Sequence, residues 1–468
     1  MGNWLPIVVN FILLFVALVA AILLLTKVKF NNNNYKLLFF LYLVYLIAPS
    51  MLKQYTGKIH NDLIRAKYDH PDLLNLVWVP TFVYGIIGIF WNPLADFLVT
   101  KFKSRKSIIL LSLIVQFVGV VPMIIKPCFV TNIIQSLCIG ISIGAVSIFI
   151  LMFNEQYGQK KIFTTVSLLS LPPMVAGFTA ATLISIVTSF INEKLDTPQE
   201  RVGKLKWILI IGLIFIIFAM ILSIFLKENK ELVFADNKYK EAVTNNSEIC
   251  LLFFVLLISL FSTFIKHCTS GGSMLLEMKF IAKHSGKGEI IDKFSAYLTP
   301  LQNIGNTSAS LLTGFVLVKK YKKATLFVFA SMLWLLFAIF SGIFVNIETK
   351  FILAIVNGFC YGMITNLLSG VMMKKYFAKT TKITPITLLS VLSSFGVVIG
   401  SFLNTFIKKP LLTKDYTTVP DVDWDEFMKL NRIIMLVIIF SIIFICFLFL
   451  SQDFIAKKYQ KKVQKEIN

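Results

Sequence analysis

Charge is scarce in this chain, and negative charge is the scarcest. Charged residues make up 15% of the 468 positions, with 24 acidic residues against 46 basic ones, whereas hydrophobic residues make up 57%. The mean hydropathy is +0.79. Soluble domains carry about 25% charged residues, so this composition excludes a soluble protein and indicates a membrane protein. The cations fall in short loops between apolar stretches instead of on one soluble face, so we expect no nucleic-acid partner.

Residue patterns that carry chemistry are also missing. The six cysteines form no CxxC pattern, so neither a metal site nor a disulfide is predicted. No GxxxxGK[ST] loop is present, which excludes an ATP-driven pump within this chain. The four histidines lack the spacing of a catalytic or metal cluster: His60, His70, His267 and His284. We therefore predict no enzyme activity and no cofactor.

Carboxylates avoid the predicted membrane interior. Every acidic residue falls in a loop or at a helix end except Asp96, which lies close to the cytoplasmic end of its helix. A carboxylate at the membrane midplane is the usual proton relay and the usual partner of a cationic substrate. Its absence argues against both uses.

Long apolar runs are what the chain does have. A spanning helix needs about 20 largely apolar residues. We predict thirteen such spans, near 4–25, 37–53, 73–98, 107–125, 128–152, 162–191, 207–226, 248–267, 295–317, 324–345, 350–372, 383–407 and 432–452. Pro172 and Pro173 are expected to kink their helix, with Ser170 able to bond a freed carbonyl.

The distribution of lysine predicts the orientation. Segments rich in Lys and Arg fall on one side of a thirteen-span path, at 26–36, 99–106, 318–323, 374–382 and 453–468. Since such segments stay in the cytoplasm, the N-terminus is predicted outside and the C-terminus inside. We expect a monomer in the plasma membrane, in contact with lipids and a small solute.

An internal repeat divides the chain. Gly140 and Gly144 recur as Gly358 and Gly362, each at an offset of 218 positions, and all four are expected to allow close helix packing. "TTVSLLS" from Thr164 recurs as "TPITLLS" at an offset of 220, and "FLVTKFKSRK" as "FVLVKKYKK" at 218. The offset covers six spans, so the two halves are parallel repeats.

This arrangement resembles the major facilitator superfamily, whose twelve helices form two six-helix halves. The resemblance implies an all-helical transporter with one extra N-terminal helix. Its expected parts are an anchor helix at 1–30, an N-terminal half at 31–226, a cytoplasmic linker at 227–247, a C-terminal half at 248–452 and a basic tail at 453–468.

One motif carries the resemblance further. "NPLAD" at 92–96 is similar to the Gly-x-Leu-Ala-Asp pattern of the family, with Asn92 in place of the glycine. By resemblance, Asp96 and the cations that follow it would latch the cytoplasmic ends of the two halves. Those cations are Lys101, Lys103 and Arg105. The alternative is an orientation signal alone.

Neutral polar residues inside the predicted spans are candidates for solute binding. Gln302 and Asn306 lie one helical turn apart, and so do Asn357 and Tyr361. Amides at these positions can bond a solute or tie helices together.

Two cations occupy similar depths in the first helix of each half, Lys53 in "SMLKQYT" and Lys266 in "STFIKHCTS", where His267 follows. This pair is similar to that of the organophosphate:phosphate antiporters of the superfamily, which hold phosphate between basic residues on the same two helices. The alternative is that both lysines reach the outer headgroups. We predict a secondary transporter of a neutral or anionic solute. The alternatives are a transporter-like receptor and, after it, a lipid-modifying enzyme.

Overall fold

The protein is all-helical in the part of the chain that the structure describes. A computed structural model describes residues 4–27, 33–67, 79–154, 162–190, 197–228, 246–268, 277, 280–281, 298–376, 385–407 and 424–467. Within these residues the only regular secondary structure is helical. Most of the linker predicted at 227–247 and of the lysine-rich segment predicted at 374–382 lies outside the described residues, at 229–245 and 377–382.

The helices follow the predicted spans. In the first part of the chain they are α1 (Trp4–Lys27), α2 (Asn33–Lys67), α3 (Val79–Phe102), α4 (Arg105–Ile125), α5 (Phe129–Gly144), α6 (Val146–Asn154), α7 (Ile162–Leu168), α8 (Leu171–Thr188) and α9 (Pro198–Phe225). In the second part they are α11 (Asn246–Cys268), α14 (Leu298–Leu312), the π-helix η5 (Thr313–Leu317), α15 (Val318–Lys320), α16 (Lys323–Ile343), α17 (Ile347–Tyr376), α18 (Pro385–Ile407) and α19 (Trp424–Ile467).

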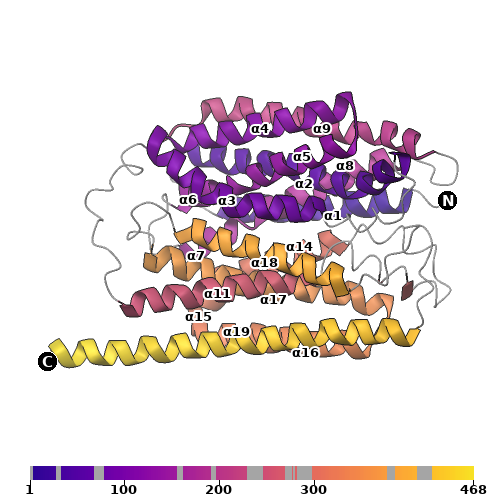
Figure 1. Ribbon diagram of the computed structural model, residues 1–468. Helices are drawn as coiled ribbons and strands as arrows, with labels where there is room; N and C mark the ends of the chain where they lie inside the picture. The colour runs from indigo at the N-terminus through magenta and orange to yellow at the C-terminus, as the bar shows by residue number, and fades with distance from the viewer. Residues whose placement is uncertain are drawn as a thin grey trace.

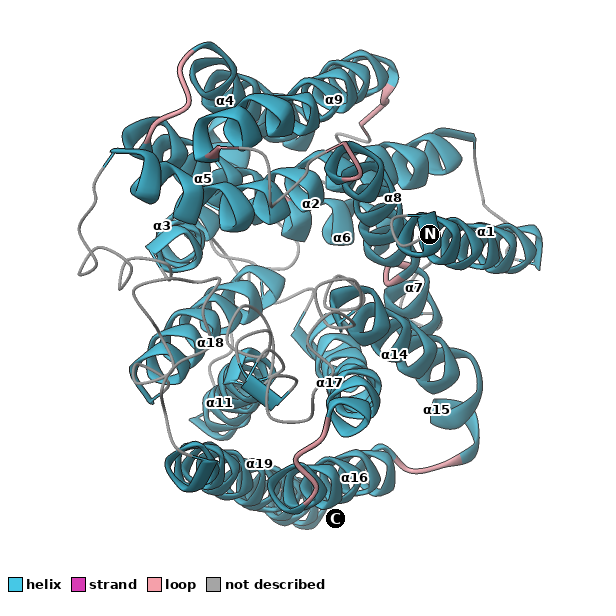
Figure 2. Ribbon diagram, turned by 90° about the vertical axis from the view of Figure 1, so that its right-hand side faces the viewer, coloured by secondary structure: helices cyan, strands magenta, loops and turns pink. Residues whose placement is uncertain are grey.

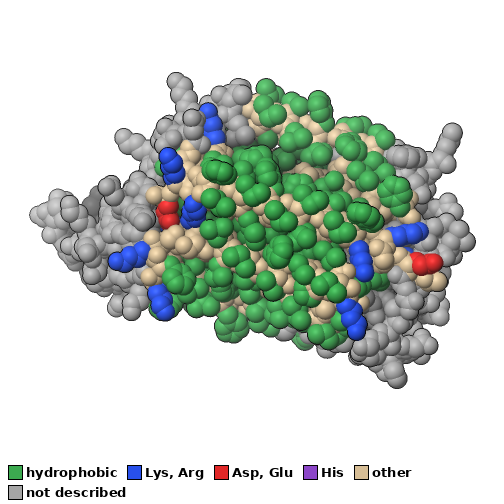
Figure 3. Space-filling model, turned by 90° about the horizontal axis from the view of Figure 1, so that it is seen from above, with side chains coloured by type: hydrophobic (Ala, Val, Ile, Leu, Met, Phe, Trp, Pro, Cys, Tyr) green, Lys and Arg blue, Asp and Glu red, His purple; other side chains and the backbone are tan. Residues whose placement is uncertain are grey.

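These helices form a multi-pass membrane protein. Eight of the described helical segments are long and apolar enough to cross a bilayer, and four shorter apolar helices accompany them. Figure 3 shows a continuous apolar band with lysine and arginine side chains at both of its ends, as expected for a lipid-facing surface. The count of thirteen spans stays a prediction.

The helices gather into two groups, with α2–α6, α8 and α9 in one and α11–α19 in the other, while α7 lies at the boundary against α14 and α17 (Figures 1 and 2). Each group has its own core of buried apolar residues. The helix bounds repeat at the offset seen in the sequence: α4 and α16 begin 218 positions apart (323 − 105) and end 218 positions apart (343 − 125). We call these groups the N-half and the C-half.

α1 lies at the edge of the N-half, against α8 (Figure 2). Ala17 and Ala21 are its small buried residues in the N-half core, while one flank of the helix exposes large apolar side chains such as Phe15. The two alanines let α1 approach α8 closely. Because its other flank is exposed, α1 is a peripheral helix attached to the N-half.

Three of the described membrane segments are interrupted, the first of them at Ala145 between α5 and α6. α7 ends at Leu168 and α8 begins at Leu171, so Pro172 falls in the first turn of a new helix, where a missing N–H costs little. Ser170 Oγ donates to the carbonyl of Ser167 at 2.6 Å, whereas the carbonyls left without an N–H by Pro172 and Pro173 are those of Leu168 and Leu169. In the C-half, α14 passes into the π-helix η5, a local distortion that is frequent at functional sites.

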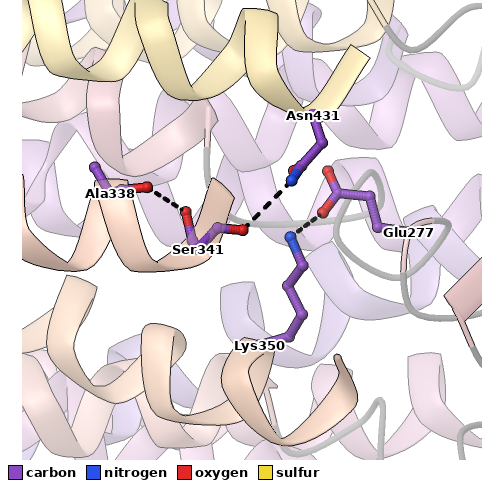
Figure 4. Close-up of polar contacts among 5 residues, drawn as sticks. All are labelled: Glu277, Ala338, Ser341, Lys350 and Asn431. Atoms are coloured by element: carbon purple, nitrogen blue, oxygen red, sulfur yellow. Dashed lines mark hydrogen bonds and ion pairs between the residues drawn. The ribbon is translucent and has the colours of Figure 1, made fainter. Parts of the chain in front are cut away.

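The end of the molecule that carries Lys101 and Lys320 is called the inner end below, and it is the predicted cytoplasmic side. At the opposite, outer end of the C-half, Lys350 at the start of α17 pairs with Glu277 at 2.7 Å, and both side chains are buried (Figure 4). Asn431 of α19 donates to the carbonyl of Ser341 at the end of α16. The first bond joins α17 to Glu277, and the second joins α19 to α16.

α2 and α19 extend far beyond the C-terminal ends of their predicted spans. α2 continues to Lys67, well past position 53, and α19 continues through the predicted basic tail to Ile467. Hydropathy marks only the part of a helix that lies in lipid, so a helix that continues into water ends later than its apolar run.

Candidate functional site

The ammonium of Lys266 lies over the ring of Tyr361, with 4.2 Å between Nζ and the ring centroid. Tyr361 is at the middle of α17, which runs from Ile347 to Tyr376. An ammonium over an aromatic face is attracted by the ring quadrupole. The side chain of Lys266 therefore turns toward the interior of the C-half at mid-helix depth, away from the outer headgroups.

Lys53 brings a second positive charge to this place from the N-half. Counted from Asn33 at the start of α2, Lys53 occupies the same position as Lys266 counted from Asn246 at the start of α11. The two ammonium groups are close enough for their charges to repel. The structure thus places the two lysines within electrostatic reach of each other, although they are far apart in the sequence.

His267 lies beside this pair, and the charges of both lysines act on it. Its Cβ is 3.1 Å from the point where a side chain on Gly400 of α18 would begin. The absence of a side chain at Gly400 therefore allows α18 to pack closely against α11 at this level.

The predicted amides lie where helices touch. Gly358 and Gly362 of α17 face the backbone of Gln302 and Asn306 of α14, and added Cβ atoms would lie 2.0 and 2.3 Å from their carbonyl oxygens. Asn357 accepts a hydrogen bond from the indole N–H of Trp334 at 2.8 Å. Asn357 therefore links α17 to α16 through its side chain, whereas the contacts of Gln302 and Asn306 with the glycines involve their backbone carbonyls.

Asn92 of the degenerate motif packs against a glycine of α5. Its Oδ1 lies 2.9 Å from the point where a Cβ on Gly144 would sit, and Asn92 itself is buried. Gly140, one turn earlier, is also buried.

Asp96 is buried in α3, which runs antiparallel to α18 across the boundary between the halves. Gly85 faces Val397 and Val398, whereas Gly88 faces Ser394. Along this antiparallel pair, later residues of α3 lie beside earlier residues of α18. Two turns beyond Gly88, Asp96 lies at the level of the first turn of α18, where the free N–H groups of the helix favour a negative charge.

The cations after Asp96 form the turn between α3 and α4. Lys101 and Lys103 are exposed, and Lys103 has a positive φ of 49°, a conformation that usually belongs to glycine. The backbone N–H of Arg105 donates to Glu228, and Lys106 Nζ donates to the carbonyl of Ile224 at 2.6 Å. These bonds join the turn to the end of α9 in the same half.

The two halves meet at the inner end around Ser167 of α7, which the sequence analysis did not single out. Its hydroxyl donates to the carbonyl of Ser310 in α14 at 2.7 Å and accepts from Asn366 of α17 at 2.8 Å. Nearby, Lys323 Nζ lies 4.6 Å from the ring centroid of Phe163. The signal for Asn366 was available, because an amide inside an apolar span needs a partner.

Glycines make this contact close. A Cβ on Gly314 in the π-helix η5 would lie 2.5 Å from the carbonyl oxygen of Phe163, and one on Gly370 would lie 2.2 Å from its ring. The interrupted segment α7–α8 and the π-helix thus touch at their distorted parts. We call this contact, centred on Ser167, Gly314, Asn366 and Gly370, the inner contact.

Comparison with known proteins identifies the fold. No family model matches the sequence, and no curated protein matches it at the level of sequence. In structure the chain is similar to the human organic anion transporter MFSD10 (TETRAN), a major facilitator superfamily transporter, with a TM-score of 0.61 and 10% identity over 87% of this chain and 98% of that one. This protein therefore has the major facilitator fold.

Proposed function

We propose that this protein is a secondary transporter that moves a small anion across the membrane by alternating access. The anion binds between Lys53 of the N-half and Lys266 of the C-half. The position of the Lys266 ammonium over Tyr361, close to the charge of Lys53, is the observation that carries the proposal.

Electrostatics supports the anionic class. Lys53 is exposed and Lys266 is half-buried, and their ammonium groups repel each other, so a bound anion converts that repulsion into two attractive pairs. Lysine is a competent point-charge partner for phosphate and carboxylate groups. The similar structure is that of an organic anion transporter, which agrees with this class.

The placement of the two lysines also links binding to movement. Because one lysine belongs to each half, an anion between them draws the halves together around it. The inner contact closes the end near Ser167 in the present conformation. Opening this contact and closing the outer side would expose the anion to the inner side, as alternating access requires.

The latch is part of the same proposal. Asp96 at the level of the first turn of α18 stabilises the closed inner end through the positive end of that helix. Lys101, Lys103 and Arg105 position the turn between α3 and α4, from which α4 is fixed to α9 by Glu228.

Uptake by proteoliposomes tests the proposal. The purified protein is reconstituted, and uptake of labelled phosphate, sugar phosphates, carboxylates, free sugars and nucleosides is measured. We expect uptake of an anion, a large loss in Lys266→Gln and retention in Lys266→Arg at matched protein levels. Uptake of neutral solutes alone, or unchanged anion uptake in Lys266→Gln, would contradict the proposed anion site. Failure to move any solute of the panel would favour a transporter-like receptor.

A further inference from the structure

A buried polar site of the N-half has no role in the anion site. It lies where α2, α4 and α5 meet, at the level of Gln116. Gln116 is near the middle of α4, which runs from Arg105 to Ile125. Because a helix rises by about 1.5 Å per residue, this places Gln116 near mid-membrane depth.

Ser142 of α5 is the centre of the site. The hydroxyl of Tyr45 in α2 donates to the carbonyl of Ser142 at 2.6 Å. The side-chain amide of Gln116 donates to the hydroxyl of Ser142. Tyr45, Gln116 and Ser142 are each at most 1% exposed, so bulk water does not reach them.

Other polar atoms at this interface have no hydrogen-bond partner among the described residues. They are Gln116 Oε1 and both amide atoms of Gln135, together with Ser112 Oγ, which faces the hydroxyl of Tyr45 without a bond of normal geometry; all are fully buried. Ser112 lies one turn from Gln116 on α4, and Gln135 lies two turns before Ser142 on α5. A buried amide without a partner is costly in a bilayer, so these atoms need a ligand.

The C-half shows that the fold does not require polarity here. At the offset of 218, Ser112, Gln116, Gln135 and Ser142 correspond to Ala330, Trp334, Leu353 and Cys360. Trp334 fills its position with a large ring and bonds Asn357 at 2.8 Å. The N-half has a smaller amide and three further polar residues at the same places, which leaves bonding groups where the C-half packs apolar atoms.

We propose that the interface of α2, α4 and α5 in the N-half binds a short row of water molecules. The atoms to be satisfied include both acceptors and donors, and water supplies both. They are spread over two turns of α5, roughly 10 Å, whereas one cation needs its oxygens within about 2.6 Å of a single point. Buried waters typically make about three hydrogen bonds to groups of this kind.

Radiolytic hydroxyl labelling of the full-length protein in nanodiscs tests this inference. X-rays generate hydroxyl radicals from bound water in place, so a buried side chain is labelled only if water lies beside it. Tyr45 is the reporter, and Trp334 is the matched control, since both are buried aromatics at the core of their own half. We expect labelling of Tyr45 and none of Trp334, although indole is the more reactive ring.

Two variants carry residues that the C-half already uses. Gln135→Leu, and independently Ser112→Ala, should cause a loss of Tyr45 labelling while the thermal midpoint stays equal or rises. Absence of labelling at Tyr45 in the unaltered protein, or full labelling in both variants, would overturn the inference. The thermal midpoint should also be the same in NaCl, KCl and choline chloride. A higher midpoint in NaCl alone would show that these side-chain oxygens bind Na⁺ instead of water.

Discussion

Lys266 is the residue on which the proposed function depends most, and Tyr361 decides where its charge lies. The ring holds the ammonium at 4.2 Å in the middle of α17. Without it, the flexible lysine stem could carry the charge toward the outer headgroups. Tyr361 is therefore a positioning residue for the proposed anion site.

Replacing Tyr361 tests this role. A cation–π contact contributes about 0.5–2 kcal/mol, so Tyr361→Leu should weaken the apparent affinity for the transported anion by a factor of about 2 to 30. Tyr361→Phe keeps the ring and should stay close to the unaltered protein. Equal affinities for the Leu and Phe variants would show that the ring does not position Lys266.

Some of the residues in the candidate site could be singled out from the sequence, and others could not. Lys53 and Lys266 could be singled out because a cation in an apolar run is costly and needs a reason. The partner of Asn357 could not, because nothing in a linear pattern shows that the indole of Trp334 reaches it from the neighbouring helix. The interruption before Pro172 was visible because proline cannot supply the N–H that continues a helix.

At the scale of helices, the contact between α14 and α17 is the most extensive among the described elements, and glycine allows it. A Cβ on Gly358 would lie 2.0 Å from the carbonyl oxygen of Gln302, and a backbone atom cannot move aside as a side chain can. Gly358→Ala should destabilise the protein by about 1–3 kcal/mol. Thermal unfolding in detergent measures the change.

Gly203 in α9 provides the matched control, because a Cβ there would meet nothing within 4 Å. Alanine is the better helix former, so Gly203→Ala should stabilise by up to about 1 kcal/mol. If both variants shift the midpoint equally, the close approach of α14 and α17 is not what Gly358 provides.

The inner contact joins elements of both halves and has to open during transport. The side chains of Ser167 and Asn366 are 2.8 Å apart, so cysteines at both positions can be joined by a short bifunctional thiol reagent. We expect this cross-link to stop transport and a cleavable version of the reagent to restore it on reduction. The two single-cysteine variants control for the native cysteines, and continued transport by the cross-linked protein would contradict alternating access at this contact.

At the scale of the whole molecule, α1 is an addition to the two halves. It contributes Ala17 and Ala21 to the N-half core and packs mainly on α8. Because both lysines of the proposed site lie on other helices, a variant that begins near residue 31 should keep the affinity of the full chain for the anion. A lost affinity in a variant that still reaches the membrane would give α1 a part in the site.

The large-scale architecture was the most predictable feature. Apolar length marks the spans, and the offset of 218 predicted that α4 and α16 would have matching bounds. What could not be predicted were the π-helix at Thr313–Leu317 and the contact of Gly314 with α7, since both depend on how the halves pack together. Tyr45, Gln116 and Gln135 stand out in the sequence as polar residues inside apolar spans, but the bonds that Tyr45 and Gln116 make with Ser142 could not be predicted from it.

The central claim is that one anion is held by both halves at once, and a double-mutant cycle on Lys53 and Lys266 tests it most directly. Apparent affinity for the transported anion is measured for Lys53→Gln, Lys266→Gln, the double variant and the unaltered protein. If both lysines bind the same anion, the two losses should not add, and the coupling energy should exceed about 0.5 kcal/mol. Strictly additive losses, or no loss in either single variant, would contradict the account.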